Sequence, residues 1–239
     1  MKRLFFFLLV LPFVGIAQTK TVITANRYIA ANDKVSEFEK ALANHAQTYH
    51  KGDLMWRVWS IESGPDAGGY MVSEGPNSWA GLDARADISA EHTNDFEKNV
   101  LPLTVGSGQS GYYEFQPDLS TVQLTDYADK IIINHMTAKP GKINEMKGLI
   151  QKLKKVWQGS NESVAVYAAV FSGEPGFIIV TRLKGGLKEL ATDFRKPLAD
   201  RYNAANGAGS FDRWLKDYAD IVQNRWSELL TYKPELSSK

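Results

Sequence analysis

Cysteine is absent from the 239-residue chain. The chain therefore has no disulfide, no thiolate nucleophile and no cysteine metal ligand. A surplus of basic charge is also missing, since 28 Lys and Arg residues face 27 Asp and Glu residues. Proteins that bind nucleic acid neutralise phosphates with a basic excess, so this balance argues against a nucleic-acid partner.

Long apolar runs are equally scarce. The one candidate is Leu4 to Ile16, which follows the positive residues Lys2 and Arg3 and precedes the small residue Ala17. It is too short for a comfortable membrane span and has the flanks of a secretory signal peptide. We therefore predict a signal peptide at residues 1–17, and a mature chain of the secreted or periplasmic compartment that does not span a membrane.

Sequence motifs of common catalytic sites are missing as well. There is no serine nucleophile elbow, no phosphate-binding P-loop and no HExxH zinc motif. The chain has four histidines, of which His45 and His50 stand on one predicted helix. Five residues correspond to about 140° around a helix axis, so these two are predicted to be surface residues, and no metal site is predicted. The glycine-rich stretches 104–111 and 206–210 are interpreted as connectors rather than dinucleotide sites.

The chain contains a long internal repeat. When the sequence is shifted by 108 residues, "NRYIAANDKVSEFEKAL" at 26–42 lies over "NHMTAKPGKINEMKGLI" at 134–150. The copies also end alike, with "YYEFQPDLS" at 112–120 and "LLTYKPELS" at 229–237. The period is far longer than a solenoid repeat. It indicates two whole domains, at residues 18–124 and 125–239.

Both copies show the same order of elements. A β-rich run is followed by a helical pattern, a β-hairpin, a second helical region and a last strand. The second helical regions are expected at 77–100 and 186–204, and the second copy adds a helix at 211–226 with an apolar stripe. The order β-α-β-β-α-β is the ferredoxin-like arrangement, so the predicted class is α+β with two tandem units.

This plan resembles the dimeric α/β-barrel superfamily, whose members include antibiotic-biosynthesis-type monooxygenases, haem-degrading monooxygenases and stress-responsive barrel proteins. The resemblance rests on element order and duplication and covers nearly the whole mature chain. It implies two units that pair their sheets around a shared interior, with the helices outside. Since one chain carries both halves of the barrel, we expect a monomer.

Side chains alternate between the two faces of a strand, which suggests what lines this interior. The more apolar face of each strand should pack on helices. The other face then presents Arg57, Trp59 and Tyr167 to the interior, together with Arg27, His135 and Arg182. These six residues form a hypothetical site for a small aromatic or anionic molecule. The alternative is that the aromatic rings merely fill the barrel while the polar groups satisfy one another.

The resemblance also raises haem as an alternative. Haem-degrading members use an Asn, a Trp and a His, and Asn26, Trp79 and His92 are the candidate counterparts. The Trp and His are further apart here than in that family, and the second copy has neither. A haem also needs an axial ligand, for which His92 or His135 is available. No cofactor is predicted, and haem stays the alternative.

Three functions follow from these observations. The first is a secreted or periplasmic barrel that binds a small molecule. The second is a monooxygenase-like enzyme, cofactor-free or haem-dependent, with chemistry inside the barrel. The third is an interaction protein of the cell envelope that docks through the added helix 211–226, although that helix is expected to do no more than cap one end of the barrel.

Overall fold

The computed structural model describes residues 19–85 and 88–239. The predicted signal peptide lies outside these residues. No helix within them is both long enough and apolar enough to cross a membrane.

Within the described residues the strands form one closed antiparallel barrel, in the order β1-β3-β2-β8-β5-β7-β6-β4. The first copy supplies one continuous run of strands and the second copy the other. The runs meet where β2 pairs with β8 and β4 pairs with β6. The strands are β1 Val22–Ala30, β2 Trp56–Ile61, β3 Tyr70–Asn77, β4 Thr104–Phe115, β5 Lys130–Ala138, β6 Val164–Val170, β7 Gly176–Arg182 and β8 Val222–Tyr232.

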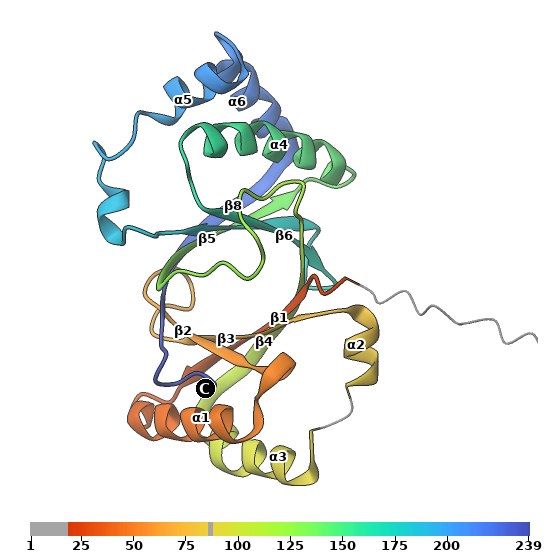
Figure 1. Ribbon diagram of the computed structural model, residues 1–239, viewed down its shortest axis with the longest axis vertical. Coiled ribbons are helices and arrows are strands. Elements are labelled where there is room, and N and C mark those ends of the chain that lie inside the picture. Colours follow the sequence, from red (N-terminus) through yellow and green to blue (C-terminus); the bar gives the residue numbers. More distant parts are fainter. Residues whose placement is uncertain (1–18, 86–87) are drawn as a thin grey trace, which may run out of the picture.

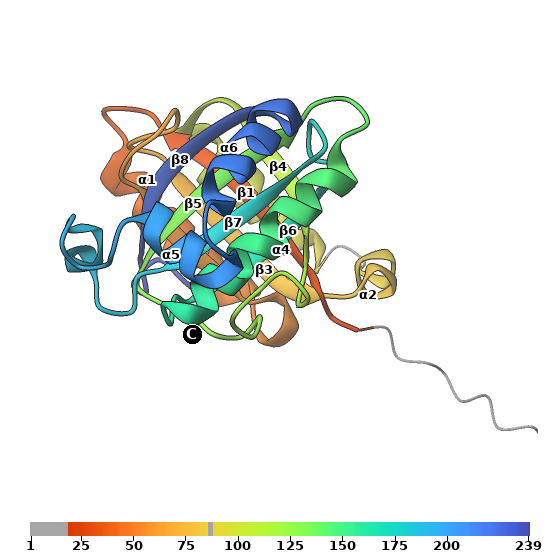
Figure 2. The same cartoon turned by 90° about the horizontal axis from the view of Figure 1, so that it is seen from above.

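Helices cover the barrel on two opposite sides (Figure 1), each set formed by one copy. The first set is α1 Val35–Tyr49, α2 Trp79–Ala84 and α3 Ala90–Asp95, with a π-helical turn at Phe96–Val100. The second set is α4 Ile143–Gly159, α5 Leu198–Asn206 and α6 Ser210–Ile221. The view from above shows α4 and α6 lying across the strands of the second copy (Figure 2). The ferredoxin-like α+β prediction is therefore confirmed.

Burial follows the apolar periodicity of the helices. In α1, Phe38, Leu42 and Ala46 recur at four-residue spacing and are fully buried against Val58 and Val72 of the sheet. Full burial of a side chain such as Phe or Leu contributes about 1.5–3 kcal/mol. Each copy has such a core between helices and sheet, and a third apolar cluster lies inside the barrel.

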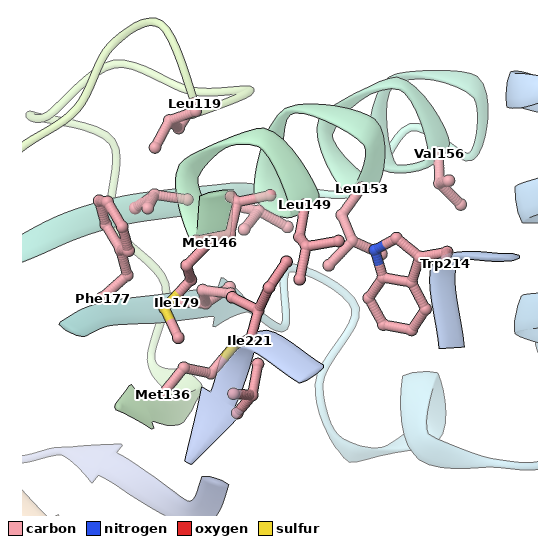
Figure 3. Packing of buried hydrophobic residues seen from close by; sticks show 14 of the residues in the cluster. Leu119, Met136, Met146, Leu149, Leu153, Val156, Phe177, Ile179, Trp214 and Ile221 are labelled. Carbon is pink, nitrogen blue, oxygen red and sulfur yellow. The ribbon is translucent and has the colours of Figure 1, made fainter. Parts of the chain in front are cut away.

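The predicted helix at 211–226 is too long. Helix α6 ends at Ile221, and the backbone of Val222 is extended because β8 pairs with β5 from this residue onward. A strand that closes a barrel satisfies its backbone groups on both sides, and this outweighs the helical stripe. Nor does α6 cap a barrel end: Trp214 packs beside Leu153 of α4 in the outer layer (Figure 3).

One expectation on loops was wrong. The stretch 104–111, predicted as a connector, forms the first part of β4 and pairs with β1. The second helical regions, expected at 77–100 and 186–204, are interrupted: the first is divided into α2, α3 and the π-helical turn that ends at Val100, and in the second α5 begins only at Leu198. Gly106 adopts a positive φ of 75° near the register shift in the β1–β4 ladder, a conformation that glycine permits at little cost.

The repeated endings cross between the copies. The hydroxyl of Ser120, at the end of the first copy, accepts a hydrogen bond of 2.9 Å from the backbone N–H of Val166 in the second. Ser237, at the end of the second copy, accepts an equal bond from Val58 in the first. Figure 1 shows the C-terminus beside α1, on the side of the first copy. Each copy is therefore closed by the tail of the other.

The leucines of the two endings follow the same crossing. Leu119 is fully buried in the core of the second copy, near Met146 of α4 (Figure 3). Leu236 is buried in the core of the first copy. The shared Pro-acid-Leu-Ser ending is thus an apolar anchor followed by a hydroxyl that satisfies a strand N–H.

Replacing Ser237 by Ala should lower the free energy of unfolding by about 1–3 kcal/mol, because the buried N–H of Val58 would lose its acceptor. Ser120→Ala should cost a similar amount. Urea denaturation followed by circular dichroism measures both. The control is Ser36→Ala at an exposed position of α1, and equal stability of Ser237→Ala and that control would contradict the role of the crossed endings.

Candidate functional site

Inward-facing side chains from both copies meet around one cavity of about 100 Å³ in the barrel. All six residues proposed from strand alternation line it: Arg27, Arg57, Trp59, His135, Tyr167 and Arg182. Most of the remaining lining is apolar, from Ile23, Ala25, Met71, Ile131, Ile133, Ile178 and Val180. An apolar wall with a few placed polar groups is the usual composition of a ligand site. That these residues bind a ligand stays a prediction.

Polar groups at one end of the cavity neutralise each other. The carboxylate of Glu228 accepts hydrogen bonds from Arg27 Nη1 at 2.9 Å and from His135 Nε2 at 2.7 Å. Arg27 also donates to Asp66 at 2.9 Å. The ring of His135 stacks on Trp226 with centroids 3.7 Å apart. Two carboxylates therefore compensate the charge of Arg27 at this end, and Glu228 links Arg27 to His135.

Glu228 is only 1% exposed. Burial alone would raise the pKa of its carboxyl group, but the hydrogen bonds from His135 and Arg27, with the charge of Arg27, hold the pKa below its ordinary value. The fold thus stabilises the ionised form of Glu228, which keeps both donors oriented.

At the opposite end of the cavity, the positive charges of Arg57 and Arg182 have fewer carboxylate partners. The Arg57 guanidinium lies over the ring of Tyr127, 4.1 Å from its centroid, and donates to the Gly75 carbonyl. Among the described residues no carboxylate lies within 4.0 Å of Arg57. Arg182, only 3% exposed, donates to the Gln123 carbonyl and lies 3.6 Å from an Asp126 oxygen.

The Asp126 carboxylate is shared, because Lys184 also contacts it. One carboxylate therefore serves two cations, while Arg57 has only neutral partners. Burial raises the pKa of Tyr167, which lies beside Arg182, to about 12, so its hydroxyl stays a hydrogen-bond donor at neutral pH. This end of the cavity has the donors and the charge to receive an anion.

Sequence reasoning missed two residues of the site. Glu228 was detectable as an acid that alternates with Trp226 and Leu230 along a strand, but the expected helix at 211–226 obscured that strand. Tyr127 lies in the segment between the copies, where neither periodicity nor repetition gives a signal.

A second polar group lies outside the barrel, beneath α1 and α3, and it corrects the prediction for the histidines. His45 and His50 are fully buried, not on the surface. Their Nε2 atoms lie 3.3 Å apart, and His92 Nε2 lies 3.2 Å from that of His50. The helical-angle argument failed because α1 ends at Tyr49, and His50 has an extended backbone that turns its side chain back.

The structure does not bring the three residues of the haem alternative into one pocket. Asn26 accepts a hydrogen bond from Ser110, Trp79 packs on Tyr112, and His92 joins the other histidines. Neither possible axial ligand fits a haem, since His135 Nε2 faces Glu228 and His92 Nε2 faces His50. The interior cavity of about 100 Å³ is also too small for a haem, since pockets for drug-sized ligands are typically about 300–1,000 Å³.

Glu228→Gln tests the charge balance inside the barrel. At neutral pH the change should cost roughly 1.5–3 kcal/mol, the worth of hydrogen bonds to a charged group. Because folding lowers the pKa of Glu228, its stabilising contribution is present above the ordinary value of 4.5 and is lost as the pH falls through the folded pKa. The stability gap between wild type and variant should therefore narrow in urea melts from pH 7 to pH 3.

An exposed Glu97→Gln variant gives the background for losing one surface carboxylate. A gap between wild type and Glu228→Gln that stays constant down to pH 3 would contradict the coupling of Glu228 to Arg27 and His135.

Comparison with known proteins gives matches by structure only: no protein family and no curated protein sequence matches this chain. An anthrone oxidase-like protein superposes with a TM-score of 0.54 at 14% identity, covering 90% of this chain and 92% of its own. A mutant chlorite dismutase from Candidatus Nitrospira defluvii gives 0.55 at 8% identity, with 92% and 94% covered.

A Fusobacterium nucleatum protein provisionally named a monooxygenase gives a TM-score of 0.53 at 12% identity, with 88% of this chain and 91% of that chain covered. Identities this low establish the fold alone. The chain therefore has the dimeric α+β-barrel fold, with both halves of the barrel in one polypeptide.

Proposed function

We propose that this protein binds a small aromatic anion inside its barrel. The observation that carries the proposal is the contrast between the two ends of the cavity. Arg27 is paired with Glu228 and Asp66, whereas Arg57 has no carboxylate within 4.0 Å among the described residues. A cation in a largely apolar cavity is costly unless it is paired, and a ligand carboxylate would supply the missing charge.

The walls favour an aromatic body on this anion. Trp59 is buried beside Met71 and Ile133 in the interior apolar cluster. A second hollow of about 230 Å³ shares Arg57, Trp59 and Tyr127 with the interior cavity. The Tyr127 ring covers the Arg57 guanidinium between the two spaces. The aromatic ring of the ligand would lie against Trp59. The ligand carboxylate would take the place of the Tyr127 ring over Arg57, since Trp59 and Arg57 line the same cavity.

Arg57→Met tests this proposal because it keeps a long apolar stem and removes the charge. A thermal-shift screen of benzoate and indole carboxylates with the mature protein identifies a ligand, and isothermal titration calorimetry measures its dissociation constant. We expect the variant to weaken binding roughly 10- to 100-fold, the worth of about 1.5–3 kcal/mol for a charged hydrogen bond. Arg213→Met, at an exposed position of α6, is the matched control and should bind as wild type.

The screen also separates the alternatives. Equal binding of acids and their uncharged amides, or equal binding by both variants, would refute anion recognition at Arg57. Consumption of the bound ligand in air would make the protein a monooxygenase-like enzyme rather than a binder. If no acid in the screen raised the melting temperature of the wild-type protein, the barrel interior would be no more than a packed core and the proposal would be refuted.

We further propose that the protein acts outside the cytoplasm as a monomer after loss of residues 1–17, which carry the features of a signal peptide. The intact mass of protein recovered from the periplasm or culture medium should match a chain that begins at Gln18. Retention of Met1 in a cytoplasmic fraction would contradict this.

A further inference from the structure

From the packing beneath α1 and α3, we propose that His45, His50 and His92 bind one divalent transition-metal ion, for which Zn²⁺ is the natural probe. One ligand nitrogen from each of these residues lies within 4.8 Å of the other two. The group lies on the outer face of the sheet, apart from the barrel cavity, and does not depend on the proposed function.

Two of the three nitrogen–nitrogen distances match coordination geometry, and the third pair lies within 4.8 Å. The Nε2 atom of His50 lies 3.3 Å from that of His45 and 3.2 Å from that of His92. With metal–nitrogen bonds of about 2.0–2.1 Å, nitrogens at the corners of a tetrahedron lie about 3.3–3.4 Å apart. Three imidazoles also leave a fourth position for water or another ligand.

Hydrogen bonds on the far sides of two rings turn their lone pairs toward each other. His50 Nδ1 lies 3.1 Å from the Leu54 carbonyl, which can only accept, so Nδ1 carries the proton. His45 Nδ1 lies 2.8 Å from the Asp95 carboxylate and donates in the same way. Both Nε2 atoms therefore present lone pairs across 3.3 Å. Such a pair repels in a buried site unless a cation lies between the two nitrogens.

Metal-binding histidines in general make the same hydrogen bonds through the ring nitrogen that does not bind the metal. A carboxylate or backbone carbonyl on the second ring nitrogen fixes the tautomer and orients the ring. Aromatic rings lock the same side chains, since His50 stacks on Trp56 with centroids 3.6 Å apart and His45 packs against Phe96.

His92 completes the group from a separate element and offers a route for the ion. The Ser89 hydroxyl accepts a hydrogen bond from the His92 backbone N–H at 3.1 Å and fixes the first turn of α3. The side chain is half-buried, whereas its two companions are fully enclosed. An ion can therefore approach from the side of α3.

The second copy shows that the fold does not need this group. The 108-residue shift pairs His45 with Leu153 and Trp56 with Val164, both buried apolar residues. Buried polar groups cost stability relative to apolar packing unless they are fully satisfied. A bound metal ion gives a reason for a histidine at position 45, where the second copy has the apolar Leu153.

Tag-free mature protein, stripped with EDTA, is titrated with ZnCl₂ by isothermal titration calorimetry. We expect one ion per chain and a rise in the melting temperature that grows with the Zn²⁺ concentration. Co²⁺ should occupy the same site and give the visible absorption of a four- or five-coordinate ion, and Mg²⁺ should not bind, because imidazoles suit zinc-like ions.

Three variants test the ligands. His45→Leu introduces the residue that the second copy has at the equivalent position, and His92→Gln changes a half-buried residue, so both variants should fold. Each should bind Zn²⁺ at least about 100-fold more weakly than the wild type. Asp95→Asn alters only the positioning of His45 and should cost about 10- to 100-fold. The control His135→Gln, in the barrel interior, should bind Zn²⁺ as wild type does. Absence of uptake by the wild type, or unchanged affinity in His45→Leu and His92→Gln, would overturn the proposal.

Discussion

The structure depends on the exchange of two chain ends between the halves of the barrel. The endings after β4 and β8 each leave their own copy and lie along the strand of the other copy at Val164–Val166 and Trp56–Val58. Gln116 and Lys233 begin these crossings with backbone bonds to Val166 and Val58. The exchange fixes the register in which β4 meets β6 and β8 meets β2. In a barrel a fixed register also decides which side chains point inward.

The closed barrel gives a single sheet two separate chemical environments. Neighbouring residues of β2 show the division: Trp56 faces α1 and donates to Glu74, while Arg57 faces the cavity. On β3, Glu74 lies 3.4 Å from His50 on the outside, and Ser73 lines the interior. The histidine group and the Arg57 end of the cavity are thus separated by only the thickness of the backbone. A slip of one residue in the register would exchange the inward-facing and outward-facing side chains.

How far the sequence predicts this arrangement depends on how local each feature is. Duplication, the order of elements and the inward face of each strand follow from periodicity, because a strand must alternate and each copy must bury one face. The end of α6 could not be predicted from periodicity, since the apolar stripe from Phe211 to Val222 fits a helix. Only the pairing of β8 with β5 makes Val222 a strand residue. Tyr127 has no periodic context at all.

The histidine group illustrates a different limit. An angle of about 140° between His45 and His50 holds only for a continuous helix, but the turn after Tyr49 places both rings on the same side. His92 arrives from α3, some 40 residues later in the chain, and no local pattern connects it to α1. Juxtaposition of residues from separate elements is decided by tertiary packing, here by the stacking of His50 on Trp56 and by the capping of α3 at Ser89.

The difference between the two copies is the strongest physical indication of where function lies. Both copies build the same scaffold, so any residue needed only for folding should have an equivalent in the other copy. Leu153 and Val164 occupy the places of His45 and Trp56 and pack well without polar partners. The first copy has instead placed histidines, a tryptophan N–H and the carboxylate of Glu74 in that space, and no described donor reaches Glu74 Oε1. Such a group costs stability that the second copy avoids, so its presence requires a reason other than folding, and three converging imidazole nitrogens supply one.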